Sequence, residues 1–240
     1  MTLWPRWTLL GVLGFLLGSA GCSRANVYAI TSEPSTDGGS DVMQDTEPVA
    51  CPSLAALPVG NTTRTLQVGS VTRNYVLHVP SAYNGTKRVP LILDFHGMGS
   101  SAANESSTSP YPAVTDPDGV IVAFPDGTVR GALGGTWNMG PCCIADVDDL
   151  GFAKTLVSHL EQVACIDPSR IYAVGVLTGS GMVYHLACNA ADIFAAVAPA
   201  AFDLLEENVE DCHPSRPLTV ISFRGTADSR VSYSPPRIVE

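Results

Sequence analysis

The stretch Gly175–Met182, GVLTGSGM, joins two segments of different character. The preceding residues, RIYAV (170–174), form an apolar run that is typical of a buried strand, and the following VYHLAC (183–188) is typical of a helix. Gly175 and Gly179 permit a tight turn between them because glycine lacks a Cβ atom. The stretch therefore predicts a sharp strand-to-helix turn, with Leu177 between the two glycines.

Strands and helices are predicted to alternate on both sides of this turn. The predicted strands are a hairpin (63–68 and 73–79) followed by 89–97, 119–127, 170–176, 194–200 and 216–225, and the predicted helices lie within 146–165 and 181–191. Asp148 and Asp149 fall in the first turn of the first helix, where the helix dipole favours negative charge. This alternation indicates one α/β domain with a mostly parallel sheet and helices on both faces.

The composition of the chain limits its partners. Its 240 residues are 45% apolar and 15% charged, which is enough for one domain with a sizeable core. The net charge of −10, without clustered Lys and Arg, argues against a nucleic-acid partner. No C-x-x-C pair, histidine cluster or dinucleotide fingerprint is present, so we expect neither a metal nor a cofactor.

The N-terminus has the pattern of an export signal. Residues 1–21 contain Arg6, a short apolar core that cannot span a bilayer, and small residues before Cys22. The segment is similar to a bacterial lipoprotein signal, in which Cys22 is acylated, although Ser19 stands where leucine is usual; an ordinary cleaved signal peptide is the alternative. In both cases we expect an extracellular or cell-envelope protein, which contacts the membrane only through a lipid anchor.

The segment 23–50 differs in composition from the rest of the chain. It is rich in Ser, Asp, Gly and Pro, which predicts a disordered acidic linker. The folded domain is expected to begin at Cys51 and to occupy residues 51–240.

The remaining cysteines predict disulfides, since an oxidising compartment favours them. Apart from Cys22 the chain contains Cys51, Cys142, Cys143, Cys165, Cys188 and Cys212. We expect Cys188 to pair with Cys212. We also expect Cys165 to pair with Cys142 or Cys143, because adjacent cysteines strain when they are bonded to each other.

Seven sequence blocks occur in an order that resembles a known family. They are PLILDFHGMG, VAFPDG, TWNMGPCC, VDDLGFAKTLV, CIDPSRIYAVGV, FAAVAP and FRGTAD. They resemble the secreted α/β-hydrolases grouped as polyhydroxybutyrate depolymerase-like and feruloyl esterase-like enzymes, over about residues 60 to 235. The resemblance implies the α/β-hydrolase fold and hydrolysis of carboxylic esters by a Ser-His-Asp triad.

The triad is incomplete in these residues. The resemblance places Leu177 at the nucleophile position and Asp228 at the position of the acid. The backbone N–H groups of Thr178 and of Gly97 or Met98 would bind the oxyanion. No histidine follows Asp228 in the 240 residues, so we expect a C-terminally truncated and catalytically impaired member of the family.

Other interpretations of these residues stay open. Ser180 is a candidate for a displaced nucleophile, and Asp228 could cap the turn that follows the last predicted strand. Trp137 could stack on an aromatic or sugar ring of a substrate or fill the core of a loop. His96 is expected to make local hydrogen bonds. The other histidines are interpreted as structural residues: His78, His159, His185 and His213.

Two functions follow from these expectations. The first is an exported carboxylic ester hydrolase-family protein, of the polyhydroxybutyrate depolymerase or feruloyl esterase type, with impaired catalysis. The alternative is a non-catalytic surface lipoprotein that binds ester or polysaccharide ligands. An apolar residue at position 177 favours binding over chemistry.

Overall fold

The computed structural model describes residues 23–30, 51, 55–129, 134–140, 142–229, 231 and 233, and of residues 23–30 only the backbone. The expected signal peptide (1–21) and the acylated Cys22 lie outside the described residues, as do residues 31–50 of the expected linker. Within the described ranges, no helix has the length and apolar character needed to cross a membrane.

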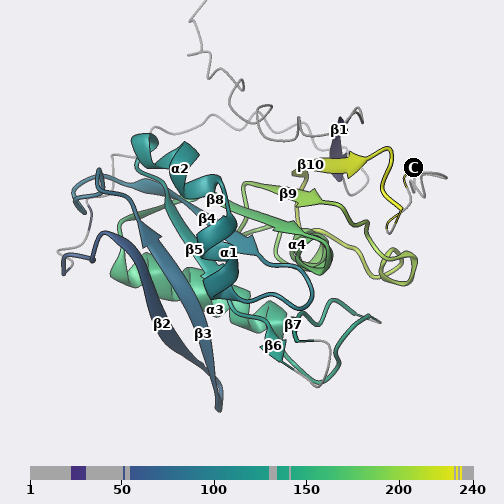
Figure 1. The fold of residues 1–240 in the computed structure, drawn as a ribbon, viewed down its shortest axis with the longest axis horizontal. Coiled ribbons are helices and arrows are strands. Elements are labelled where there is room, and N and C mark those ends of the chain that lie inside the picture. Colours follow the sequence, from purple (N-terminus) through teal and green to yellow (C-terminus); the bar gives the residue numbers. More distant parts are fainter. Residues whose placement is uncertain are drawn as a thin grey trace, which may run out of the picture.

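Eight of the described strands form one twisted sheet at the centre of the molecule (Figure 1). In spatial order they are β1 (Ser23–Ile30), β10 (Leu218–Gly225), β9 (Ala196–Ala200), β8 (Ile166–Val176), β4 (Val89–Phe95), β5 (Ile121–Pro125), β3 (Val71–Val79) and β2 (Gly60–Val68). The strands from β10 to β5 are parallel to their neighbours, whereas β3, β2 and β1 pair in antiparallel fashion. A separate ribbon pairs β6 (Thr128–Val129) with β7 (Gly135–Thr136).

Helices cover both faces of this sheet. They are α1 (Ala102–Thr108), α2 (Tyr111–Thr115), α3 (Asp149–Val163) and α4 (Thr178–Asn189), with short 3₁₀ helices at Asp116–Asp118 (η1) and Glu206–Asn208 (η3). Because side chains alternate along a strand, β4 serves both layers. Leu93 and Phe95 belong to the core that contains the α3 and α4 residues, whereas Ile92 packs in the smaller core beneath α1 and α2. The expected α/β-hydrolase fold, with its mostly parallel sheet, is confirmed.

The strand β1 differs from the sequence expectation. Ser23–Ile30 was assigned to the disordered linker, but this segment pairs with the whole of β10, from Ser23 opposite Gly225 to Ile30 opposite Leu218. Its sequence contains valine, tyrosine and isoleucine, which favour strands. The outer edge of β10 offers unpaired backbone groups, and β1 satisfies them.

The disulfides correct one of the two expected pairings. Cys188 and Cys212 are bonded, as predicted. The prediction that Cys165 bonds to Cys142 or Cys143 is wrong, because Cys165 bonds to Cys51 and the two adjacent cysteines bond to each other. Cys143 has a φ of 105°, and this unusual backbone conformation accompanies the closure of the adjacent pair.

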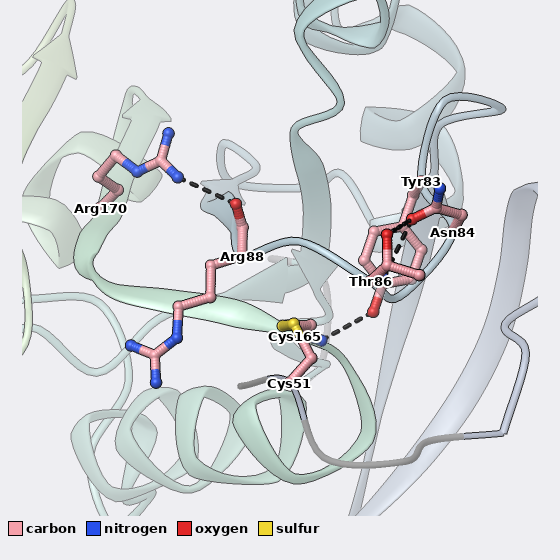
Figure 2. Close-up of a disulfide and its surroundings, with 7 residues drawn as sticks. All are labelled: Cys51, Tyr83, Asn84, Thr86, Arg88, Cys165 and Arg170. Carbon is pink, nitrogen blue, oxygen red and sulfur yellow. Dashed lines mark hydrogen bonds between the residues drawn. A yellow bond between two sulfur atoms is a disulfide. The ribbon is translucent and has the colours of Figure 1, made fainter. Parts of the chain in front are cut away.

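The Cys51–Cys165 disulfide attaches the beginning of the folded domain to the start of β8 (Figure 2). The backbone N–H of Cys165 donates to the Tyr83 hydroxyl at 2.7 Å. On the same side of the sheet, the Arg170 guanidinium donates to the Arg88 carbonyl at 3.0 Å and pairs with Asp167. These contacts hold the loop before β4 against β8, the strand that pairs with β4.

A buried carboxyl group lies directly before the loop that follows β4. Asp94 is 3% exposed and faces α1, where the Ser109 hydroxyl donates to it at 2.7 Å. Burial raises the pKa of Asp94 to about 7, the hydrogen bond from Ser109 opposes this shift, and the negative charge of Glu105 adds to it. Burial also raises the pKa of the neighbouring Tyr111 to about 12.

This carboxyl group predicts a pH dependence of stability. Because the folded pKa lies above the value of the unfolded chain, Asp94 favours folding at low pH, and this contribution is lost as the pH rises from about 4 through about 7. The loss can reach about 4 kcal/mol. We expect Asp94→Asn to remove this decline and to be more stable than the native chain at pH 8 in urea unfolding. The matched control is Asp118→Asn at an exposed position, and an unchanged pH profile for Asp94→Asn would contradict the prediction.

Candidate functional site

The predicted strand-to-helix turn is present between β8 and α4. β8 ends at Val176, α4 begins at Thr178, and Leu177 between them has φ 54° and ψ −122°. The backbone N–H of Leu177 donates to the Ala200 carbonyl at 3.0 Å, and its carbonyl accepts from the Gly181 N–H at 3.2 Å. Leu177 therefore lies at the apex of a turn whose backbone is bonded to β9 and to the first turn of α4.

Two glycines make this turn possible by bringing backbones into contact. A Cβ atom on Gly175 would lie 2.7 Å from the backbone of Gly179 and 3.0 Å from the Phe95 carbonyl oxygen. A Cβ atom on Gly179 would collide with the Phe95 carbonyl itself. Both glycines are therefore required for α4 to pack this closely against the end of β4. This requirement does not depend on the residue at position 177.

The close approach at Gly179 can be tested by substitution. We expect Gly179→Ala to lower the free energy of unfolding by about 3 kcal/mol or more, because the obstructing atoms belong to backbone and the strand must move. Gly181→Ala in the same helix should have a smaller effect, since the new Cβ atom meets the end of the flexible Met139 side chain. Urea unfolding of both variants measures the difference, and equal losses would contradict the prediction.

The side chain of Leu177 lies over the neighbouring loop. Its Cβ and Cδ1 atoms are each 3.3 Å from the point where a Cβ atom on Gly97 would lie, so the isobutyl group contacts the loop that follows β4. Leu177 is 39% exposed, and Met98 in the same loop is 41% exposed. An apolar surface formed by Leu177 and Met98 therefore lies at the apex of the turn.

The backbone of Leu177 is strained, which gives a second test. A non-glycine residue at positive φ with this ψ costs on the order of 1–3 kcal/mol, and glycine avoids this cost. We expect Leu177→Gly to be more stable than Leu177→Ala by about 1 kcal/mol in urea unfolding. At Ala103, an exposed position of α1, the preference should be reversed, with alanine better than glycine by about 1 kcal/mol. Equal stability of the two Leu177 variants would show that the turn is relaxed.

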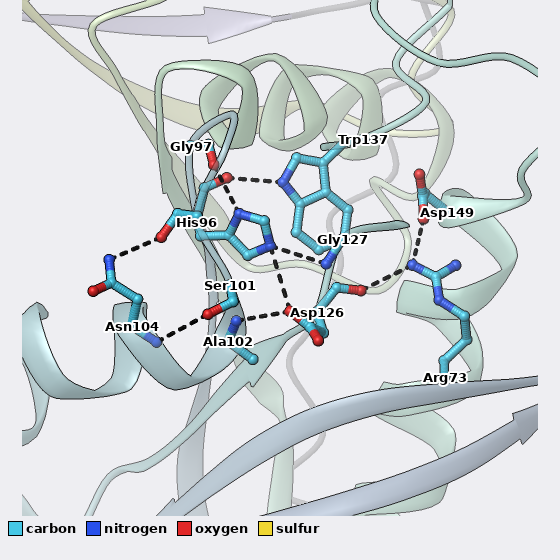
Figure 3. A network of polar contacts seen from close by, with 11 residues as sticks. Arg73, His96, Gly97, Ser101, Ala102, Asn104, Asp126, Gly127, Trp137 and Asp149 are labelled. Carbon is cyan, nitrogen blue, oxygen red and sulfur yellow. Dashed lines mark hydrogen bonds and ion pairs between the residues drawn. The ribbon is translucent and has the colours of Figure 1, made fainter. Parts of the chain in front are cut away.

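The loop after β4 is supported by a buried histidine (Figure 3). The Nδ1–H of His96 donates to the Gly97 carbonyl at 2.8 Å, and Nε2 accepts from the Gly127 N–H at 2.9 Å. This pattern requires the neutral ring, and burial lowers the pKa of His96 accordingly. Gly127 and Gly135 surround the ring, and a Cβ atom on either would crowd it. The expected role of His96 in local hydrogen bonding is confirmed.

A buried ion pair extends this network across the molecule. Arg73 on β3 pairs with Asp149 at the start of α3 at 2.7 Å, and its guanidinium also donates to the Asp126 carbonyl. Asp149 accepts in addition from the Asn138 N–H at 2.6 Å. The Asp126 carboxylate accepts from the Ala102 N–H at the start of α1. The network thus joins β3 and the starts of α1 and α3 to the loops that carry Asp126 and Asn138 (Figure 3).

These supporting residues were only partly anticipated from sequence. Asp149 was interpreted as a residue that stabilises the helix dipole, and Arg73 was not singled out. The two lie 76 positions apart, so no local pattern links them. The one signal available was an arginine within an otherwise half-apolar strand, two residues before Tyr75 and therefore on the same face of the strand as that buried side chain.

The structure does not support a substrate-stacking role for Trp137. Its side chain is fully buried, its Nε1–H donates to the His96 carbonyl at 2.8 Å, and its ring packs edge-on against Phe95. The second interpretation, that it fills the core of a loop, is the one that the structure favours. The indole is buried because β4 and the β7–α3 loop enclose it.

The other hydroxyl groups near the turn are not available as nucleophiles. Ser180 is fully buried, and its hydroxyl donates to the Phe202 carbonyl at 3.2 Å, which argues against the interpretation as a displaced nucleophile. Thr178 is 5% exposed. As the first residue of α4, its backbone N–H has no acceptor within the helix.

Asp228, which the resemblance places at the position of the acid, lies in the turn after β10. Its carboxylate accepts from the Val231 N–H at 3.0 Å, and its own N–H donates to the Gly225 carbonyl. The turn-capping interpretation of Asp228 is therefore supported by its contacts. Among the residues that the structure describes, no group of three or more His, Cys, Asp or Glu side chains could hold a metal ion.

Comparison with known proteins gives related esterases. No family model matches the chain. Feruloyl esterase B of Piromyces equi is 42% identical over 165 residues, which are 68% of this chain and 30% of that protein. The protein named "Putative esterase NocK" of Nocardia uniformis subsp. tsuyamanensis is 34% identical over 220 residues, 90% of this chain and 62% of that protein. Among solved structures, an acetyl xylan esterase from Aspergillus awamori gives a TM-score of 0.48 at 16% identity, over 57% of this chain and 50% of that one. The chain thus spans less than two thirds of the length of these relatives.

Proposed function

We propose that the chain is an exported member of the esterase-like α/β-hydrolases that binds ester ligands without forming an acyl-enzyme. The observation that carries this proposal is Leu177 at the apex of an otherwise intact turn. In the family's reaction an oxygen nucleophile at this position attacks the ester carbonyl. A leucine side chain has no lone pair and cannot form that bond.

Neighbouring groups do not replace the nucleophile. Ser180 and Thr178 are buried, and the Ser180 hydroxyl is directed to a backbone carbonyl. His96, which lies in the loop facing Leu177, uses both ring nitrogens in hydrogen bonds. Ligand binding can nevertheless persist, because the oxyanion donors are backbone groups that do not depend on the residue at position 177.

The ligand class follows from the relatives and from the surface of the site. A relative named feruloyl esterase supports feruloylated polysaccharide as the ligand of this chain. Leu177 and Met98 offer apolar contact area beside the backbone N–H groups of the turn. An ester with an apolar acyl group matches both features, since its carbonyl accepts hydrogen bonds and its acyl group covers the two side chains.

The proposal includes the location of the protein. The export signal in residues 1–21 and the cysteine at position 22 support a protein held at the cell envelope through a lipid on Cys22. A soluble extracellular protein is the alternative if the signal is only cleaved. Metabolic labelling with a clickable palmitate analogue, compared between the native chain and Cys22→Ser, distinguishes the two.

Ester hydrolysis tests the catalytic part of the proposal. For a protein of these 240 residues we expect turnover of p-nitrophenyl acetate and methyl ferulate no more than about 10⁴-fold above the reaction in water, without a burst. Leu177→Ser should raise kcat/KM by less than about 10³-fold, because a serine without a base is a poor nucleophile. Calorimetry should meanwhile detect methyl ferulate binding to the native chain, and Leu177→Lys should abolish it.

Two results would contradict this proposal. A native chain whose turnover falls on Ser180→Ala would place the nucleophile at Ser180 after all. A native chain that neither hydrolyses nor binds methyl ferulate or hydroxybutyrate oligomers would remove the binding function, while leaving the loss of catalysis intact.

A further inference from the structure

The Cys142–Cys143 disulfide lies in the loop between β7 and α3, and this loop contacts both sides of the candidate site. Trp137 bonds to the carbonyl of His96 in the loop after β4. Met139 lies against Gly181 in the first turns of α4, and its carbonyl accepts from the Asn208 side chain at 2.6 Å. The conformation of this loop therefore bears on the two backbone segments that would hold a ligand.

The disulfide closes this loop at its tightest point. Asn138 and Cys143 form an isolated antiparallel bridge, and the Asn138 side chain donates to the Val147 carbonyl at 2.8 Å. Cys143 has a φ of 105°, a conformation that a residue with a Cβ atom adopts only at an energetic cost. Without the bond between the sulfur atoms, Cys143 is free to relax toward negative φ.

The three disulfides differ in their accessibility. Cys165 and Cys188 are 3% and 4% exposed, so each of their bonds has one buried partner. Cys142 and Cys143 are both half-buried, so neither partner of this bond is enclosed as deeply as Cys165 or Cys188. Exposed disulfides, and those in strained segments, are the ones that thiols reduce most readily.

We propose that Cys142–Cys143 is a redox site, at which a dithiol reductant opens the disulfide and releases the loop that supports the candidate site. A thiolate of the reductant attacks one sulfur, forming a mixed disulfide and expelling the other cysteine as a thiolate, which takes up a proton. The second thiol of the reductant then displaces the first cysteine. Two electrons and two protons pass to the protein, and the reductant becomes a cyclic disulfide.

The release has a defined structural consequence. When Cys143 relaxes, the Asn138–Cys143 bridge is lost. The segment that carries Trp137 and Met139 is then held less firmly against the loop after β4 and the first turns of α4. We expect the loop after β4 and the first turn of α4 to open more often in the reduced protein. The proposal does not depend on whether the site hydrolyses or binds esters.

Graded reduction of the full chain tests the redox site. The native chain is equilibrated with dithiothreitol at increasing concentrations, alkylated and mapped by peptide mass spectrometry. We expect Cys142 and Cys143 to be alkylated at a dithiol concentration about tenfold lower than that needed for the other two pairs. At that concentration, amide hydrogen exchange in residues 94–100 and 134–140 should be faster by about tenfold, with little change in α3.

A second readout uses the indole of Trp137. The chain contains three tryptophans, and Trp4→Phe with Trp7→Phe leaves Trp137 as the reporter of the loop. Reduction should shift its emission to longer wavelength and increase acrylamide quenching. In this background Cys142→Ala/Cys143→Ala should resemble the reduced protein without added dithiol, and should then respond to no further dithiol at these concentrations.

Two outcomes would overturn the proposal. Reduction of Cys142–Cys143 only after the other two disulfides would exclude a redox site there. Selective reduction that leaves both hydrogen exchange and Trp137 fluorescence unchanged would exclude its effect on the site. Should the double alanine variant fail to fold, graded reduction of the native chain decides both questions.

Discussion

The contact between the backbone of α4 and the end of β4 is the constraint on which the site depends. Gly179 lies so close to the Phe95 carbonyl that no side chain fits, and Gly175 meets Gly179 in the same way. With the helix held this near to the strand, the chain must reverse direction within one residue, and Leu177 takes the positive φ that this reversal requires. The geometry that would expose a nucleophile is therefore a consequence of packing, and it survives although position 177 holds an apolar residue.

The loop that faces Leu177 depends on a second constraint, the satisfaction of buried polar groups. His96, Asp149 and Arg73 are each less than a tenth exposed, and unpaired groups in such positions are strongly destabilising. Each has partners: His96 bonds to two backbone groups, and Asp149 bonds to Arg73 and to the Asn138 N–H. Because these bonds join β3, β4, α3 and the β7–α3 loop, the loop with Gly97 keeps its shape without any contribution from a nucleophile.

Sequence patterns were sufficient for the central architecture because these patterns and the architecture share one cause. The continuous apolar runs of β4, β5 and β8 are buried on both faces by helices, and the 3.6-residue spacing at Phe152, Leu156 and Leu160 places these side chains in the core. Leu177 was likewise identified from sequence, because the flanking glycines are required by packing. The pairing of β1 with β10, the Arg73–Asp149 ion pair and the burial of Trp137 arise from contacts between distant segments. Such contacts cannot be predicted from local sequence patterns.

The bond between Cys142 and Cys143 was missed for a different reason. The prediction applied a general rule that adjacent cysteines strain when bonded to each other, and it did not consider a backbone with positive φ at Cys143.

The backbone of the turn and the side chain at its apex are under different constraints. The turn is defined by backbone features: two glycines, a strained apex and a helix that begins at Thr178. Such features are maintained by the stability of the fold, since changing either glycine forces β4 and α4 apart. The side chain at the apex is 39% exposed and no comparable packing contact restricts it, so this residue can change while the sequence around it stays similar to that of the related esterases. Similarity of the surrounding sequence blocks is therefore evidence for the fold, whereas the chemistry of the site depends on the side chain at position 177.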